Sequence, residues 1–497
     1  MKINKLLVAN RGEIALRVMR TAREMGIATV AVYSEADRLS PHVRYADEAV
    51  CLGPPPSNQS YLLGDKIIAE AKRLGVDAIH PGYGFLSENA DFAKAVMAAG
   101  IIFVGPPVKA IEIMGSKLAA KDAVKGYDIP MVPGVDRAIT DPQEAKMIAK
   151  QVGFPVLIKA SAGGGGKGMR VVENPDELEE QMQRAVSEAT SAFGDGSVFV
   201  EKYITSPRHI EMQVLADNHG NVVHLFEREC SIQRRHQKVV EEAPSVILTP
   251  ELRAQMGKSA IDVARACGYS GAGTVEFLVD ANLDYFFLEM NTRLQVEHPV
   301  TELITGVDLV RQQILVAQNE PLTFTQDDLE INGHALELRV YAEDPNNNFL
   351  PSVGTLKTYR PPQGHGVRID DGFEEGMDIP IFYDPMIAKL VTYGENREEA
   401  LRRMQRAIHD YEITGVATTL PFGDFVMQHE AFVSGKFDTH FVKKYFSPQK
   451  NTGNEEEAKV AALLANQILD KARPTNTENG AISSQKSASK WKARRRG

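Results

Sequence analysis

GTVEFLVDANLDYFFLEMNTR, residues 273–293, contains two apolar strand-like runs separated by the turn-forming residues DANLD. If this hairpin is symmetric about Asn282 and Leu283, Glu276 faces Glu289 directly across the two strands. Facing like charges destabilise a sheet, and two carboxylates among Val, Phe and Leu are costly to bury without a partner. A divalent cation bound between them removes both costs, so the hairpin predicts a metal site.

The residues that follow extend this site. Asn291 lies two positions beyond Glu289 and therefore shares its face of the strand, where it offers an oxygen ligand of the kind that Mg²⁺ or Mn²⁺ accepts. If the extended conformation continues, Arg293, Gln295 and Glu297 follow along the same edge. Together they would form an anion site with a base at its end. The alternative is a solvated sheet face whose polar residues simply alternate outward.

A run of glycines marks a second feature, ASAGGGGKGMR at residues 160–170. Strand-like PVLIKA and MRVV flank it, which predicts a β-hairpin, yet a hairpin turn needs only one or two glycines. The excess indicates a tip whose backbone N–H groups close over phosphate oxygens, with positive charge from Lys159 and Lys167. It is not a P-loop, because Gly168 stands where Ser or Thr would hold Mg²⁺. The alternative is a flexible surface loop.

A basic stretch supports the phosphate interpretation. In ECSIQRRHQKVVEEAP, residues 229–244, four basic side chains follow a predicted strand: Arg234, Arg235, His236 and Lys238. Alone, such a run is most often a solvated face. Beside a predicted metal pair and a glycine-rich tip it indicates phosphoryl transfer, in which positioning and charge neutralisation do most of the catalysis.

Composition limits the class of protein. The 497 residues are 43% hydrophobic, enough for roughly three domains of about 150 residues each. The net charge is −10 and the strongly basic cluster is confined to residues 490–496, which argues against nucleic-acid binding. A signal peptide and a long apolar run are both lacking, which predicts a cytoplasmic protein outside the membrane. Three cysteines without metal-ligand spacing fit buried thiols in a reducing compartment.

The order of predicted elements gives the fold class, α/β and α+β. Residues 1–115 alternate strand and helix, which predicts a parallel α/β domain. Asp37 after the second strand would suit a dinucleotide cofactor, but the first turn lacks G-x-G-x-x-G, so a dehydrogenase is the weaker alternative. Residues 116–333 mix strands and helices, and 334–446 predict a third, mixed α/β domain. Residues 447–497 predict one short helix and a disordered basic tail.

Six motifs in order resemble the biotin carboxylases, an ATP-grasp enzyme family. They are LLVANRGEIALRVMR, HPGYGFLSEN, KASAGGGGKGMR, RHIEMQVLAD, ECSIQRRHQKVVEEAP and LEMNTRLQVEHPVTE, and YDPMIAKL extends the resemblance into the third segment. The resemblance covers about residues 1–446. It implies a Rossmann-like N-terminal domain, an ATP-grasp domain whose glycine-rich lid spans about 131–204, and a C-terminal biotin carboxylase domain.

The resemblance also assigns roles to residues. Those implied to contact ATP are Lys117, Lys159, Gly164, Gly165, Gly166, Glu201, Lys202, Ile204, His209, Gln233, His236, Glu276 and Glu289. Two Mg²⁺ or Mn²⁺ ions would bind Glu276, Glu289 and Asn291. Bicarbonate would bind Lys238, Arg293, Gln295, Val296 and Glu297. Tyr83 would lie near the biotin ring, and Arg339 would stabilise the biotin enolate. Catalysis would fall to Glu297 as the base, with Arg339, Lys238 and Arg293.

The implied reaction joins bicarbonate to the γ-phosphate of ATP as carboxyphosphate, which breaks into CO₂ and phosphate. Phosphate then takes the N1 proton of biotin, and biotin attacks CO₂. The lid would exclude water that hydrolyses carboxyphosphate.

The partners implied are a biotin carboxyl carrier protein and carboxyltransferase subunits, because no Ala-Met-Lys-Met motif follows residue 446; a homodimer is also implied. The acceptor stays open between acetyl-CoA, as in fatty acid biosynthesis, propionyl-CoA and pyruvate. Two alternatives remain open for the function: another ATP-grasp carboxylate–amine ligase, such as a carbamoyl-phosphate synthetase or a purine-pathway ligase, and a catalytically silent nucleotide-binding scaffold.

Overall fold

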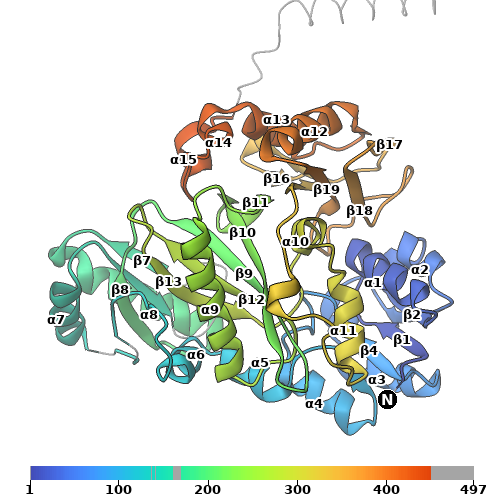
Figure 1. The fold of residues 1–497 in the computed structure, drawn as a ribbon, viewed down its shortest axis with the longest axis horizontal. Coiled ribbons are helices and arrows are strands. Elements are labelled where there is room, and N and C mark those ends of the chain that lie inside the picture. Colours follow the sequence, from blue (N-terminus) through green and yellow to red (C-terminus); the bar gives the residue numbers. More distant parts are fainter. Residues whose placement is uncertain (1, 136, 140, 161–168, 449–497) are drawn as a thin grey trace, which may run out of the picture. The chain divides into compact units, whose positions relative to one another are not determined.

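The N-terminal segment forms the predicted parallel sheet in a computed structural model that describes residues 2–135, 137–139, 141–160 and 169–448 (Figure 1). The strand order β3-β2-β1-β4-β5 places the first strand at the centre. This order is that of a Rossmann-like half, with helices between successive parallel strands. The elements are β1 Lys5–Val8, α1 Gly12–Glu24, β2 Ala28–Ser34, α2 Pro41–Tyr45, β3 Glu48–Gly53, α3 Gly64–Arg73, β4 Ala78–His80, α4 Ala90–Ala98, β5 Ile102–Phe103 and α5 Val108–Met114.

Asp37, which suggested a dinucleotide site, is occupied by protein groups. Arg11 binds its carboxylate through two nitrogens, Nε at 2.6 Å and Nη2 at 2.7 Å, and the Tyr61 hydroxyl donates to it at 2.5 Å. Asp37 is 2% exposed. Because a ribose would have to displace these three bonds, the weaker dehydrogenase interpretation loses its acidic residue.

The predicted lid, about residues 131–204 and called the lid below, contains a separate three-stranded sheet, ordered β7-β6-β8. β6 and β7 pair antiparallel, Val156 with Val172 and Lys159 with Met169, so the predicted hairpin is confirmed. The glycine run at its tip lies outside the described residues. The lid has its own apolar core, which includes Ile148 and Leu178. Its elements, with the helix that precedes them, are α6 Lys117–Val124, α7 Pro142–Val152, β6 Val156–Ala160, β7 Met169–Val172, α8 Leu178–Phe193 and β8 Val198–Lys202.

An eight-stranded sheet forms the body of the molecule, ordered β13-β12-β9-β10-β11-β14-β19-β18. Its strands are β9 Arg208–Ala216, β10 Val222–Arg234, β11 Gln237–Ala243, β12 Gly271–Val279, β13 Tyr285–Asn291, β14 His334–Tyr341, β18 Val367–Asp371 and β19 Met386–Gly394. Helix α9 (Pro250–Ala266) crosses the strands in Figure 1, and its Met256, Ala260 and Val263 share a core with Val214 and Val275. Two further helices are α10 His298–Thr305 and α11 Leu309–Ala317.

This sheet continues past residue 333, where a domain boundary is predicted. β11 pairs with β14, so strands of the predicted ATP-grasp and C-terminal segments are hydrogen-bonded to each other. The chain divides into two compact units, Met1–Pro448 and Gln449–Gly497. The second unit, with its predicted helix and tail, lies outside the described residues.

The C-terminal segment covers the far end of the sheet with helices. α12 packs an apolar face that includes Leu401 and Met404, and the Asn396 side chain caps it by accepting from Glu399 N. Such an N-cap satisfies a donor that the helix itself leaves free. The remaining elements are β15 Glu343–Asp344, β16 Leu350–Pro351, β17 Thr358–Arg360, α12 Arg397–Asp410, β20 Glu412–Thr414, α13 Leu420–Gln428, α14 Glu430–Val433 and α15 Phe441–Tyr445. Among the described residues, no helix combines the length and apolarity that crossing a membrane requires.

The hairpin of β12 and β13 has the predicted register at the end that carries Glu276, Glu289 and Asn291. Glu276 pairs with Glu289 across β12 and β13, and Thr274 pairs with Asn291. Between the pairs Glu276–Glu289 and Phe277–Phe287 the register shifts, because Leu288 is an extra residue on β13. The turn is therefore centred on Asn282 and not between Asn282 and Leu283, so its predicted centre is wrong by half a residue. Instead, the Asp280 carboxylate accepts from the N–H groups of Asn282 and Asp284 within the loop.

Candidate active site

One cavity of about 1350 Å³ brings the predicted site residues together from all three segments. Glu297 is the exception among the described ones: it does not line the cavity and is fully buried behind it. Gly164, Gly165 and Gly166 lie outside the described residues. The lining includes Tyr83, Lys117, Lys159, Glu201, Lys202, Ile204, His209, Gln233, His236, Lys238, Glu276, Glu289, Asn291, Arg293, Gln295, Val296 and Arg339.

The basic stretch is a tight hairpin. Arg234 pairs with Gln237, so Arg235 and His236 alone form the turn between β10 and β11. Their φ angles are +50° and +68°, the pattern of a type I′ turn, which suits the twist of a hairpin but is uncommon without Gly or Asn. Because the turn is tight, both side chains line the cavity, and strain of this kind is characteristic of functional sites.

Two cations hold the predicted base. Lys238 Nζ lies 2.7 Å from Glu297 Oε1, and Arg339 Nη2 lies 3.0 Å from Glu297 Oε2. Burial alone would raise the pKa of Glu297, but Lys238, Arg339 and Arg228 outweigh it and hold that pKa well below its usual range. Glu297 is therefore ionised, and its affinity for a proton rises when a bound anion draws Lys238 or Arg339 away from it.

The path of the chain to Glu297 differs from the prediction. β13 ends at Asn291, and Glu297 is the N-cap residue of α10, so the extended conformation does not continue to it. The loop between them is fixed by the N-terminal segment: Arg293 Nε donates to Glu88 Oε2 at 2.7 Å, and Thr292 N donates to Glu88 Oε1 at 3.1 Å. Arg293 still reaches the same cavity, by a turn rather than by strand alternation.

The predicted metal ligands have opposite electrostatics. Burial raises the pKa of Glu289, and the facing Glu276 raises it further. At Glu276 the burial effect is outweighed by Lys238 and His209, which lower the pKa. Lys117, His209 and Lys159 oppose this rise at Glu289 only in part, whereas the cations beside Glu276 outweigh burial. Glu276 and Glu289 offer carboxylate oxygens, the ligands that Mg²⁺ or Mn²⁺ prefers. Asn291 Nδ2 donates to Glu276 Oε1 at 2.9 Å, so the amide has to turn over to offer its oxygen to an ion.

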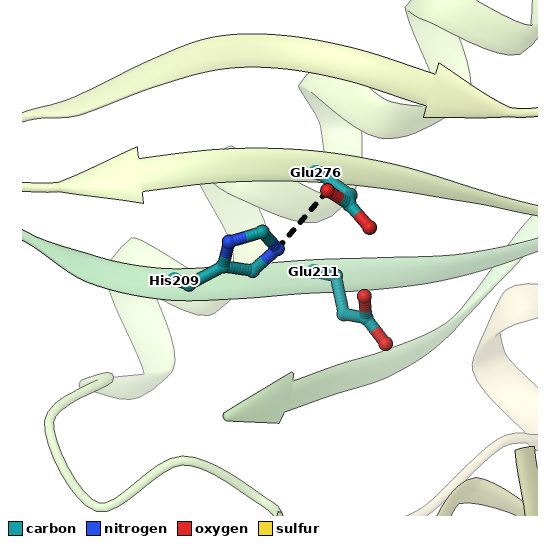
Figure 2. A group of neighbouring side chains, drawn as sticks. All are labelled: His209, Glu211 and Glu276. Atoms are coloured by element: carbon teal, nitrogen blue, oxygen red, sulfur yellow. Dashed lines mark ion pairs between the residues drawn. The ribbon is translucent and has the colours of Figure 1, made fainter. Parts of the chain in front are cut away.

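A second group of ligand atoms lies beside it, made of His209, Glu211 and Glu276 (Figure 2). His209 and Glu211 come from β9 and Glu276 from β12, and His209 Nε2 lies 3.0 Å from Glu276 Oε2. Glu211 already accepts from two cations, Lys238 Nζ at 2.5 Å and Arg228 Nε at 2.5 Å. Because Arg228 and Lys238 balance the charge of Glu211, the set of His209, Glu211 and Glu276 fits a metal ion less well than the set of Glu276, Glu289 and Asn291.

The lysines that are predicted to contact ATP have different partners. Lys159 Nζ lies 2.7 Å from Glu201 Oε2, within the lid. Lys202 donates to the carbonyls of Gly153 and Phe154 at 2.8 and 3.0 Å. Burial lowers the pKa of Lys117, although Glu289 opposes the shift. An approaching polyphosphate would supply the negative charge that stabilises this buried ammonium.

Several residues of the site were missed from the sequence. Glu211 could have been found, because His209, Glu211 and Gln213 alternate with apolar residues along β9 and so share one face. Arg228 is completely buried and contacts Glu211, and Glu241 accepts from Arg339 Nε at 2.6 Å. Arg228 is the cross-strand partner of Glu211 in the β9 and β10 hairpin, so the register of that hairpin could have found it. No local pattern marks Glu241, because Arg339 is far from it in sequence.

Three family models match the chain. They describe the biotin carboxylase N-terminal domain over residues 2–111, the ATP-binding domain of the carbamoyl-phosphate synthase L chain over 116–325, and the biotin carboxylase C-terminal domain over 337–444.

Curated relatives match over most of the chain. A pyruvate carboxylase subunit of Methanothermobacter thermautotrophicus is 55% identical over 442 residues, 89% of this chain and 90% of that protein. Biotin carboxylase 1 of Bacillus subtilis is 53% identical over 444 residues, 89% of this chain and 99% of that protein. Propionyl-CoA carboxylase alpha chain of Ruegeria pomeroyi is 53% identical over 463 residues, 89% of this chain and 68% of that protein.

Solved structures agree with these relatives. A biotin carboxylase β-γ-ATP complex from Campylobacter jejuni superposes with a TM-score of 0.87 at 46% identity, covering 89% of this chain and 99% of that one. The biotin carboxylase domain dimer of Hydrogenobacter thermophilus 2-oxoglutarate carboxylase, in complex with MgADP, ADP and bicarbonate, gives 0.86 at 48% identity, covering 90% and 98%.

Proposed function

The chain belongs to the biotin carboxylase family, and from that premise we propose how its own residues carry out the reaction. The enzyme is an ATP-dependent ligase that carboxylates biotin with bicarbonate, using ATP and a divalent metal ion. The observation that carries our assignment of roles is the buried, ionised Glu297 held between Lys238 and Arg339.

The first step uses Glu297 as the base. Its carboxylate takes the proton of bicarbonate, and the bicarbonate oxygen attacks the γ-phosphorus of ATP, with ADP as the leaving group, to give carboxyphosphate. Lys238 and Arg293 line the cavity beside it and stabilise the anionic reactant. Once Glu297 is protonated its negative charge is lost, so Lys238 can turn its attraction to the carbonate.

Metal binding falls to the hairpin. Glu276, Glu289 and Asn291 would hold the ion or ions, which when bound neutralise the phosphate oxygens of ATP. Lys117 and Lys159, which line the same cavity, bind phosphate. The glycine-rich tip, including Gly164, Gly165 and Gly166, covers the nucleotide and keeps water from carboxyphosphate.

The second step transfers the carboxyl group. In carboxyphosphate, the bond between the carbon and the oxygen that bridges it to phosphorus breaks, which gives CO₂ and phosphate. The phosphate then takes the N1 proton of biotin. The biotin enolate then attacks CO₂. We assign stabilisation of the enolate oxygen to Arg339. Glu241 and Glu297 fix its Nε and Nη2, and its Nη1 donates to the Tyr341 hydroxyl at 3.4 Å, a long bond that an enolate oxygen could replace. Tyr83 forms part of the wall against the ring.

Release of ADP tests this assignment against the other ATP-grasp ligases. We expect ADP release to require bicarbonate and to rise when biotin is added. A requirement for ammonia or another amine in place of biotin would identify an amine ligase instead. ATP binding without any bicarbonate-dependent turnover would identify a silent scaffold.

The partners are proposed at a finer level than the family itself. We infer a biotin carboxyl carrier and a carboxyltransferase, a homodimer like that described for the Hydrogenobacter domain, and a cytoplasmic location. The relatives named for pyruvate, propionyl-CoA and methylcrotonoyl-CoA carboxylases resemble this chain to similar extents, so the acceptor depends on the partner. Mass spectrometry of proteins that copurify with the chain identifies that partner, and recovery of no biotinylated protein would contradict the proposal.

A further inference from the structure

Lys389 is a completely buried lysine on β19 that contacts groups from three parts of the chain. Its Nζ donates to the Val296 carbonyl at 2.9 Å. The same nitrogen lies 3.3 Å from Glu13 Oε2 on α1 and 3.7 Å from Asp370 Oδ2 on β18. A buried ammonium is expensive unless its protons are all bonded. The three partners together meet this need. One of them, the Val296 carbonyl, is neutral and lies in the loop that carries the predicted bicarbonate residues.

The Lys389 contact is one of several that hold the loop at residues 292–297. The loop has no regular secondary structure, and it connects β13 to α10. Glu88 fixes its first half through Thr292 and Arg293. Lys389 fixes its second half at Val296, next to Glu297. The position of the peptide between Val296 and the base is thus set by a side chain of the C-terminal segment.

The other partner of Lys389 leads to the biotin wall. The Tyr83 hydroxyl donates to Glu13 Oε1, while Glu13 Oε2 faces Lys389. A continuous path of polar contacts therefore runs from Tyr83 through Glu13 and Lys389 to the carbonyl of Val296. Its two ends are a predicted biotin contact and a predicted bicarbonate contact.

We propose that Lys389 and Glu13 are positioning residues that couple the biotin wall at Tyr83 to the 292–297 loop at Val296. The proposal rests on the function proposed above and assigns neither residue a contact with substrate. When the ring presses on Tyr83, the Glu13 carboxylate and the Lys389 ammonium transmit the displacement to the loop that holds bicarbonate and the base.

The charges around this path favour coupling over a plain ion pair. Asp370 has its own cation, Arg368 Nη2 at 2.7 Å, so Lys389 is not needed to neutralise it. Burial raises the pKa of Glu13 to about 7, and Lys389 is the main group that opposes the rise, so the charge of Glu13 depends on Lys389. Glu337 and His298 are the other titratable groups on which Lys389 acts. His298 Nδ1 lies 2.8 Å from the Gln295 carbonyl, so it also holds the loop, by a contact that is separate from the path through Glu13.

The experiment measures KM for bicarbonate and for ATP separately, by ADP release with biotin present. In Lys389→Met the bicarbonate KM should rise about tenfold or more, the loss expected for a hydrogen bond to a charged group, while the ATP KM stays within about twofold. Glu242→Gln is the matched control for the Glu13→Gln variant described below: Glu242 is also a buried carboxylate with a cationic partner, Arg397, but it lies outside the path. It should lower the melting temperature and leave both KM values unchanged.

A cycle of variants keeps the test independent of whether Lys389→Met folds. Glu13→Gln should also raise the bicarbonate KM. Tyr83→Phe should raise it in the wild-type background but add nothing in the Glu13→Gln background, because coupled residues give non-additive effects. Additive effects, or an equal rise in both KM values, would overturn the coupling while leaving the proposed function intact. If the wild-type chain itself shows no bicarbonate-dependent ADP release, the proposed function fails, and the coupling with it.

Discussion

Lys238 Nζ lies 2.7 Å from Glu297 Oε1 and 2.9 Å from Glu276 Oε1, so one ammonium bridges the predicted base and a predicted metal ligand. A metal ion that neutralises Glu276 weakens its hold on Lys238. Lys238 is then available to Glu297 and to the anion beside it. The bridge therefore links the charge of the metal site to the environment of the base.

Glu297→Gln should remove the proton acceptor while keeping the shape of the side chain. We expect bicarbonate-dependent ATP cleavage to fall by ~10² or more, with the Kd for ATP unchanged. Steady-state assays of ADP release give the rate of ATP cleavage, and calorimetric titration with ATP gives the Kd. Turnover near the wild-type level would remove Glu297 from the mechanism.

The two hairpin glutamates should respond differently to the same change. Glu289→Gln should stabilise the metal-free protein, because it removes the charge that burial and Glu276 disfavour. Glu276→Gln should destabilise it, because Lys238 and His209 lose a partner. Both variants should need more Mg²⁺ for activity. Melting temperatures with and without Mg²⁺ measure this contrast, and an unaltered metal requirement in both would refute the assigned site.

Glu242 predicts a specific pH dependence of stability. Despite burial, His334 and Arg397 lower its pKa from 4.5 to about 2. A carboxylate whose pKa is lower in the folded state stabilises it above the unfolded pKa and loses that contribution as pH falls through the folded pKa. Glu242→Gln should therefore reduce the free energy of unfolding on the order of 3 kcal/mol at about pH 7.

The difference between wild type and Glu242→Gln should shrink steadily below about pH 4.5. Urea unfolding of both proteins at about pH 7 and about pH 3.5 measures it. A difference that stays constant over this range would mean that His334 and Arg397 do not lower this pKa.

The glycine run gives a prediction about nucleotide binding. Replacing Gly164 and Gly165 by alanine restricts the backbone conformations open to the tip. We expect weaker ATP binding, by at least several-fold, with little change in melting temperature. An unchanged affinity would favour the interpretation as a surface loop.

The sequence was informative where the interactions are local. Hairpin symmetry placed Glu276 opposite Glu289 correctly, because the bulge at Leu288 offsets the displacement of the turn. The apolar runs on both sides of the glycines predicted the β6 and β7 hairpin correctly, because that pairing too is between neighbouring segments. Strand alternation failed beyond Asn291, where tertiary contacts to Glu88 turn the chain and period-two reasoning no longer applies.

Long-range contacts explain what was not predicted. Lys389, Glu13 and Glu241 each look like an ordinary charged residue in their own segments. Their role depends on which segments come together. Glu13 and Lys389 are far apart in sequence, and the packing of α1 against β18, the neighbour of β19, brings them within 3.3 Å. A single sequence contains no periodicity that reports such a meeting.

Among the described residues, the lid is joined to the body by few backbone bridges, of which Met131 with Phe287 is one. Its three-stranded sheet is hydrogen-bonded within itself, and its core is its own. The lid can therefore open as a cooperative unit without breaking a ladder of the eight-stranded sheet. In hydrogen–deuterium exchange, the amides of β6 and β8 should then exchange together, earlier than those of β9 and β12, and nucleotide should slow the first group far more than the second.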